Sequence, residues 1–157
     1  MEYSFEFSER LIEAADALQL NSVDKEETSR AILYFSCLSC EISMKAVLES
    51  AGYSKSKLRS FSHQLDKLLD GISSCSHIDS ESRASSIRAK VVEKGFINGT
   101  VGTLLTHKLE DISTYPNQVR YGELVHHYPP EIMLKCAKVV HAWCKENQGK
   151  LRKFISQ

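Results

Sequence analysis

A glutamate and a lysine, Glu41 and Lys45, lie four residues apart within the most apolar stretch of the chain. This stretch, residues 26–50, holds neither proline nor glycine and is predicted to be one long helix. Four residues make about one helical turn, so the two side chains share a face and can form an ion pair. A buried carboxylate needs donors. We expect a structural network rather than catalysis, with His63 as a helix cap or a further member.

A pair of cysteines, Cys37 and Cys40, has the two-residue spacing of many metal and redox sites. Such sites normally use two pairs, and no second pair follows. On an apolar helix these thiols are expected to pack in the core. The chain has five cysteines, an odd number without a disulfide-framework spacing, which indicates reduced thiols. We therefore expect neither a metal site nor a cofactor.

Composition indicates a globular, cytoplasmic protein. The 157 residues are 42% hydrophobic and 25% charged, with a formal net charge of zero, and the first residues lack the pattern of a secretory signal. We expect no membrane association. The sequence also lacks a glycine-rich phosphate loop followed by Lys-Ser or Lys-Thr, and it lacks a nucleophile elbow.

Hydrophobic periodicity predicts an all-α chain, because helical spacing recurs throughout and strand alternation is missing. The economical architecture is a single domain over 1–157, an up-and-down helical bundle with additional short helices. The expected helices cover 8–20, 26–50, 62–72, 79–91, 103–112 and 130–154, with a loop at 95–102 and a turn at 115–117.

Residues with capping chemistry set the expected helix ends. Ser8 and Ser62 are expected to cap two helices, because a serine hydroxyl can accept from amides of the first turn. Gly52 is expected to end the long helix, and Pro130 suits the first turn of the last one.

Three segments carry a resemblance to a known family. They read SCEISMKAVLESAGY, SHQLDKLLDGI and NQVRYGEL, in that order. This order is similar to that of the HEPN family (higher eukaryotes and prokaryotes nucleotide-binding). Its members show a glutamate and a lysine on an apolar helix, a His-polar-Leu helix start and an Arg-Tyr pair before the final helix. The resemblance spans about residues 28–155.

The resemblance implies a four-helix up-and-down bundle that commonly forms a homodimer. It also implies nucleotide binding or metal-independent RNA cleavage. Many relatives belong to toxin–antitoxin or phage-defence systems, often beside a small nucleotidyltransferase. A nucleotidyltransferase or an antitoxin is therefore an expected partner.

The resemblance further implies a catalytic pair. Catalytic relatives carry an arginine, four to six residues and then a histidine, and one group adds a tyrosine two positions later; Arg120, His126 and Tyr128 match this outline. Tyr128 is the hydroxyl that a nucleotidyltransferase would modify. Tyr121 and His127 are further candidates for binding, although Tyr121 replaces the polar residue that usually follows the arginine.

The chemistry of Arg120 and His126 suits RNA cleavage without a metal. Such cleavage needs a base for the 2′-hydroxyl proton and a cation for the developing phosphorane charge. Residues six apart do not share a helix face, so the pair could converge only through a loop or across a dimer. The alternative is a solvated loop with incidental histidines. We also expect the loop around Arg120 and Tyr121 to supply donors to Glu41.

Three functions remain open from the sequence. The first is a metal-independent endoribonuclease acting as a toxin or a defence effector. The second is a non-catalytic HEPN module that binds nucleotide, RNA or a nucleotidyltransferase. The third is a helical dimerisation protein that binds no nucleotide. One fold can carry several functions, so the geometry of the site is needed to choose among these three.

Overall fold

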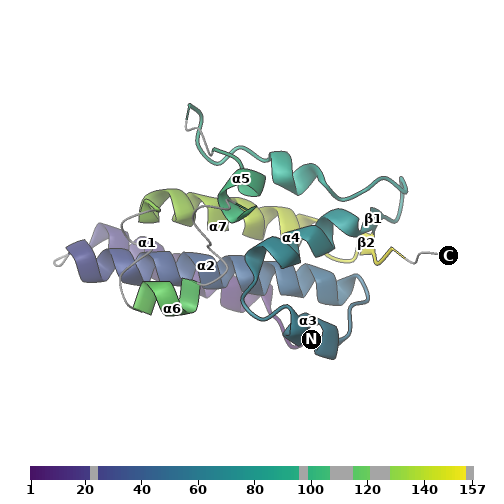
Figure 1. The fold of residues 1–157 in the computed structure, drawn as a ribbon, viewed down its shortest axis with the longest axis horizontal. Coiled ribbons are helices and arrows are strands. Elements are labelled where there is room, and N and C mark those ends of the chain that lie inside the picture. Colours follow the sequence, from purple (N-terminus) through teal and green to yellow (C-terminus); the bar gives the residue numbers. More distant parts are fainter. Residues whose placement is uncertain (22–24, 96–98, 107–114, 121–127, 155–157) are drawn as a thin grey trace.

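The computed structural model describes residues 1–21, 25–95, 99–106, 115–120 and 128–154, and these are all-α as predicted. Helices run in the order shown in Figure 1, with one short antiparallel ladder at the end from which the C-terminus leaves. The elements are α1 (Phe5–Leu20), α2 (Lys25–Ser50), α3 (Lys55–Ser60), α4 (Leu65–Ser74), β1 (Ser76–His77), η1 (Ser86–Ala89), α5 (Val101–Thr106), α6 (Tyr115–Arg120), α7 (Pro130–Glu146) and β2 (Leu151–Arg152).

The long helix α2 is the centre of the fold. It packs along α1 and α7, and more briefly against α4 and α6. By length and composition α2 could cross a membrane, but 72% of its apolar window is buried inside the protein. That burial is the behaviour of a core helix and is compatible with a soluble protein.

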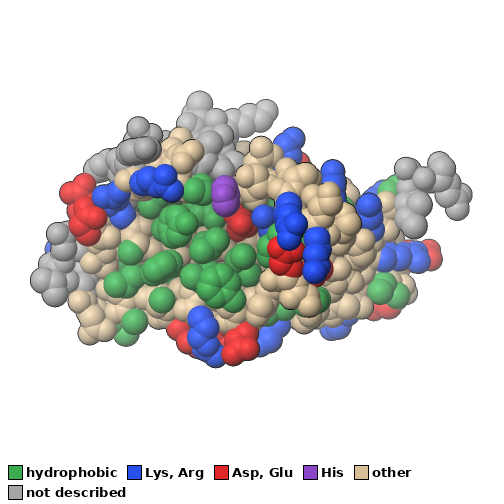
Figure 2. All heavy atoms as spheres, turned by 90° about the horizontal axis from the view of Figure 1, so that it is seen from below, with side chains coloured by type: hydrophobic (Ala, Val, Ile, Leu, Met, Phe, Trp, Pro, Cys, Tyr) green, Lys and Arg blue, Asp and Glu red, His purple; other side chains and the backbone are tan. Residues whose placement is uncertain are grey.

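One side of α2 is less completely covered. Ala31, Tyr34, Phe35 and Leu38 are intermediate or exposed, although they are spaced by three and four residues like a core-facing stripe. Figure 2 shows apolar side chains gathered over the middle of the face seen from below. A contiguous apolar area on a protein surface commonly marks a binding site.

Two predicted helix caps are corrected by the structure. Helix α1 begins earlier than expected, because Ser4 is its N-cap and accepts from the Phe7 amide at 3.3 Å. Ser8 instead lies inside the helix and is fully buried. Ser62 has a left-handed backbone (φ +52°), and α4 starts only after Gln64.

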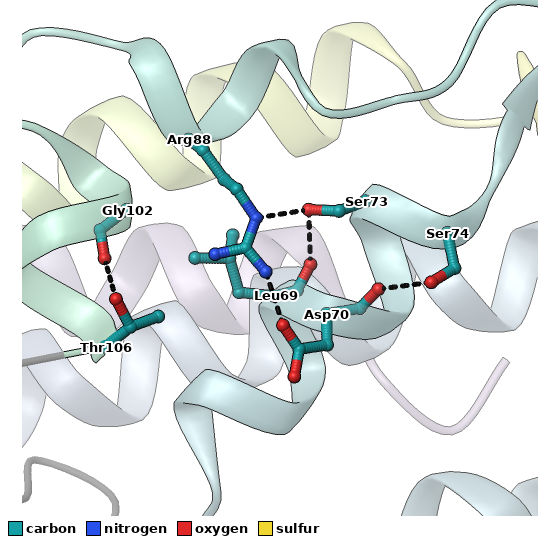
Figure 3. A network of polar contacts seen from close by, with 7 residues as sticks. All are labelled: Leu69, Asp70, Ser73, Ser74, Arg88, Gly102 and Thr106. Atoms are coloured by element: carbon teal, nitrogen blue, oxygen red, sulfur yellow. Dashed lines mark hydrogen bonds and ion pairs between the residues drawn. The ribbon is translucent and has the colours of Figure 1, made fainter. Parts of the chain in front are cut away.

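The predicted helix at 79–91 is wrong. Only the 3-10 turn η1 forms there, and it is fastened to α4 by polar contacts (Figure 3). Arg88 Nε donates to Ser73 Oγ at 2.8 Å, and the same guanidinium pairs with Asp70. Ser73 Oγ in turn donates to the Leu69 carbonyl at 2.8 Å. Contacts of one arginine thus hold this segment, in place of the backbone hydrogen bonds of the predicted helix.

The end of the chain also differs from expectation. The predicted turn at 115–117 is the first turn of α6, where proline is tolerated because the second residue of a helix has no amide partner to lose. Helix α7 stops at Glu146 rather than near Phe154. Gly149 follows with φ +74°, and β2 then pairs with β1.

Candidate functional site

Glu41 is the hub of a buried polar network between α2, α6 and the turn before α4. The residue is only 4% exposed, and its carboxylate accepts three hydrogen bonds. Lys45 Nζ donates to Oε2 at 3.3 Å, the Tyr115 hydroxyl donates to Oε1 at 3.0 Å, and His63 Nδ1 lies 2.7 Å from Oε1. The structure thus brings Glu41, Lys45 and His63 together and adds Tyr115.

The charges in this network are balanced. Lys45 is also buried, at 5% exposed, and its ammonium lies 5.4 Å from the centre of the Tyr3 ring. Burial, and next the charge of Glu41, raises the pKa of Tyr115, so its hydroxyl keeps its proton and remains a donor. Removing either partner of a buried ion pair leaves an uncompensated charge, so a substitution of Glu41 or Lys45 should destabilise the fold.

His63 joins this buried network to the surface. Its side chain is 51% exposed, whereas the Glu41 side chain is 6% exposed. A carboxylate can only accept, so His63 Nδ1 must carry the proton of their bond. The neutral ring then presents Nε2 as an acceptor. The Tyr115 ring meets the imidazole edge-on, with 5.8 Å between ring centres.

An open groove of about 460 Å³ lies between α2 and α6, beside this network. It is lined by Glu27, Arg30, Ala31, Tyr34, Phe35, Pro116, Val119 and Arg120. The Tyr34 ring in its wall packs edge-on against Tyr115 at 5.7 Å. Two arginines, two aromatic rings and the Glu41 network therefore belong to one region of the surface.

The two arginines of the groove differ in their contacts. Arg30 donates through Nε to the Val119 carbonyl at 3.0 Å, donates through Nη2 to the Arg120 carbonyl, and pairs with Glu27 at 3.2 Å. It therefore holds the C-terminal end of α6 onto α2. Arg120 is exposed, and its backbone carbonyl accepts the hydrogen bond from Arg30.

The predicted catalytic and binding residues divide into two groups. Arg120 lines the groove and Tyr128 is buried at 6% exposed. His126, His127 and Tyr121 lie outside the described residues.

The loop around Arg120 and Tyr121 was expected to supply donors to Glu41; Tyr121 lies outside the described residues, and within them Tyr115 rather than Arg120 donates from α6. Among the described side chains, the hydrogen-bond donors to Glu41 are Lys45, His63 and Tyr115. Tyr115 is not evident as a donor from the sequence, because the proline that follows it is typical of a turn. Its position five residues before Arg120 was the available signal.

A second buried polar cluster was not predicted. Ser8 of α1 bonds Ser39 and Ser43 of α2 at 2.7 and 2.5 Å, and His141 Nδ1 of α7 lies 3.2 Å from the Ser8 hydroxyl. Burial lowers the pKa of His141, which favours the neutral ring. The cluster is enclosed by the three long helices, so its role is structural.

The cysteines behave as core residues. All five are buried and reduced. Interaction with the Cys136 side chain of α7, and next burial, raises the pKa of Cys40 well above its usual value. Within the described ranges, no group of three or more His, Cys, Asp or Glu side chains is arranged to hold a metal ion.

Comparisons with protein-family models, with characterised proteins and with solved structures return no match to this chain. The function must therefore be argued from the site itself.

Proposed function

We propose that this protein is an HEPN-like module that binds single-stranded RNA in the groove between α2 and α6. The observation that carries the proposal is the exposed Arg120 beside a wall of aromatic rings from Tyr34 and Phe35. Arginine recognises phosphate through a forked set of donors, and aromatic side chains stack on unpaired bases. The resemblance of the three sequence segments to the HEPN family supports the same substrate class.

The groove fits a short stretch of nucleic acid better than a duplex. Its volume of about 460 Å³ is the size of a small-molecule site, so it accommodates one or two nucleotides. Among the described residues of the groove, Arg30 is held by α6 and Glu27, whereas Arg120 is exposed, so we expect Arg120 to contact the phosphate. We expect weak, salt-dependent binding, because a single phosphate contact contributes little alone.

Binding is tested with fluorescence anisotropy of a labelled single-stranded RNA at low and at moderate salt. Arg120→Ala and Tyr34→Ala should each weaken binding at least several-fold. Arg152→Ala is the matched control, because Arg152 is an exposed arginine in β2, paired with Glu81 away from the groove. Equal binding by all variants, or none by the wild type, would refute the proposal.

Cleavage is the second part of the proposal. The resemblance supports a metal-independent endoribonuclease of a toxin–antitoxin or phage-defence system, in which Arg120 stabilises the phosphorane charge and His126 transfers a proton. RNA digestion in the presence of a chelator tests this, with Arg120→Ala, His126→Ala and His127→Ala compared. Activity that requires a divalent metal, or that is lost only with His127→Ala, would contradict the assignment.

Partners follow from the same family resemblance. A homodimer is proposed because the family that the three segments resemble commonly dimerises, and because Arg120 and His126, six residues apart, could converge across a dimer. Light scattering across a dilution series should report twice the monomer mass. A nucleotidyltransferase or an antitoxin remains the proposed regulatory partner, with Tyr128 as the candidate for modification.

A further inference from the structure

The half-exposed imidazole of His63 is the side chain whose surroundings most need a functional explanation. It lies outside the arginine-histidine pair that the family resemblance points to. Yet its Nδ1 is fixed at 2.7 Å to a carboxylate that is almost fully buried. A buried carboxylate that orients an exposed imidazole is the arrangement by which enzymes hold a histidine in one tautomer for proton transfer.

The orientation of the His63 ring is fixed by Glu41 and Tyr115, which also contact each other. Glu41 holds Nδ1, and the Tyr115 ring meets the imidazole edge-on at 5.8 Å between centres. The Tyr115 hydroxyl donates to the same carboxylate oxygen at 3.0 Å, so the two rings share one anchor. The side chain is 51% exposed, and within the described residues its hydrogen bond to protein is made through Nδ1.

The charge of Glu41 is compensated within the network by Lys45. Lys45 is buried at 5% exposed and pairs with Glu41 at 3.3 Å, so the carboxylate already has its counter-ion. His63 is therefore not required to carry a positive charge to stabilise Glu41. A histidine in this condition can accept a proton through Nε2 and release it to solvent.

The ring contacts also connect His63 to the proposed RNA groove. Tyr115 packs against His63 on one side and against Tyr34 on the other, and Tyr34 lines the groove. Tyr115 also begins the helix that ends with Arg120, which rises about 1.5 Å per residue. The imidazole thus lies one aromatic ring beyond Tyr34 of the groove wall.

We propose that His63, oriented by Glu41, takes the general-base role that the family resemblance would give to His126, and removes the 2′-hydroxyl proton of RNA bound at the groove. In this step Nε2 takes the proton, the 2′-oxygen forms a bond to the adjacent phosphorus, and the bond from phosphorus to the 5′-oxygen breaks. The 5′-oxygen leaves with a proton from water, and His63 returns its proton to solvent. The products are a 2′,3′-cyclic phosphate and a 5′-hydroxyl. Glu41 is the positioning residue. This inference rests on the proposed RNA binding.

The decisive variant is His63→Asn. The asparagine amide occupies the place of Nδ1 and can still donate to Glu41, but it has no basic nitrogen at the place of Nε2. Cleavage of a labelled RNA in the presence of chelator should fall at least about 100-fold, the ordinary contribution of a general base. RNA binding, measured by anisotropy, and the urea unfolding midpoint should stay unchanged. His77→Asn is the matched control, because the His77 ring instead packs on Trp143 at 6.5 Å.

A second measurement does not depend on turnover. Diethyl pyrocarbonate acylates accessible imidazole nitrogen, so His63 should react in the isolated protein. A 2′-deoxy oligonucleotide of the same sequence, which cannot be cleaved, should slow that reaction at least several-fold while leaving His77 unaffected. Peptide mass mapping reports both sites.

The outcomes separate this inference from the proposed function. RNA that binds the wild type but is never cleaved, His63→Asn that retains full activity, or unprotected acylation of His63 would each overturn the role of His63 and leave RNA binding intact. Failure of RNA to bind the wild type would refute the proposed function and, with it, the base assignment.

Discussion

Replacing Glu41 with alanine should be the most damaging single change among the polar residues of the site. The substitution removes the acceptor of three hydrogen bonds and leaves the Lys45 ammonium, 5% exposed, without its counter-ion. It also leaves the fully buried Tyr115 hydroxyl without its acceptor. Breaking a buried ion pair from one side costs about 3–5 kcal/mol. We therefore expect Glu41→Ala to lower the free energy of unfolding by that amount.

Two further variants separate charge from hydrogen bonding. Glu41→Gln keeps an acceptor oxygen of nearly the same shape but loses the charge, so its cost should be smaller, about 1–3 kcal/mol. Adding Lys45→Met to Glu41→Gln removes the uncompensated ammonium and should recover part of the loss. Recovery in the double variant is the signature of a true ion pair.

Urea denaturation followed by far-ultraviolet circular dichroism gives the midpoint and slope for each variant. Glu13→Ala is the matched control, because Glu13 forms an ion pair with Arg10 in which both side chains are 55% exposed. Its midpoint should stay at the wild-type value. A wild-type midpoint for Glu41→Ala would show that the buried carboxylate contributes nothing to the fold, and the network argument would fail.

Three other predictions concern the core. Burial lowers the pKa of His141 below 6.5, so folding keeps this ring neutral. Its stabilising contribution is present above pH 6.5 and is lost as the pH falls further. The unfolding midpoint of the wild type should therefore decline below pH 6.5, and His141→Gln should flatten that decline. Gly102→Ala should destabilise the protein by about 1–3 kcal/mol, because the new methyl group would lie 3.0 Å from the Arg88 carbonyl. Gly71→Ala, whose new methyl group has its closest contact at 3.4 Å, should be tolerated. Thermal unfolding of the two variants compares them directly. The five buried thiols should resist Ellman's reagent until the protein unfolds, including Cys75, whose pKa burial raises to about 11, and rapid labelling of the native protein would contradict the packing described.

The helices that the sequence predicts well are long ones, in which buried apolar residues recur at a regular spacing. Helices α1, α2 and α7 follow from apolar residues that recur at helical spacing over several turns. The segment at 79–91 shows the same spacing, but the Arg88 contacts with Ser73 and Asp70 hold it as a short 3-10 turn. Tertiary contacts of one side chain therefore override a weak local pattern, and no periodicity argument detects them.

The site divides in a similar way. The ion pair of Glu41 and Lys45 is visible in the sequence because four-residue spacing and an apolar background are both local properties. Its third donor comes from Tyr115, which is 74 residues away along the chain, so only the packing of α6 on α2 reveals it. The Ser8 cluster was missed for a related reason, because a serine near a helix start is normally interpreted as a cap.

The central place of α2 has a consequence for how the protein forms in the cell. Helix α2 ends at Ser50, but its partner α7 begins only at Pro130, so an apolar helix leaves the ribosome long before the surface that covers it has been synthesised. During that interval α1 can shield one side of α2, while the side that will receive α7 stays exposed to water. Contacts of such large sequence separation form slowly and leave a nascent chain prone to association. Completion of the core therefore has to wait until α7 has been synthesised, and the yield of folded protein should depend on chaperones that bind apolar segments during synthesis.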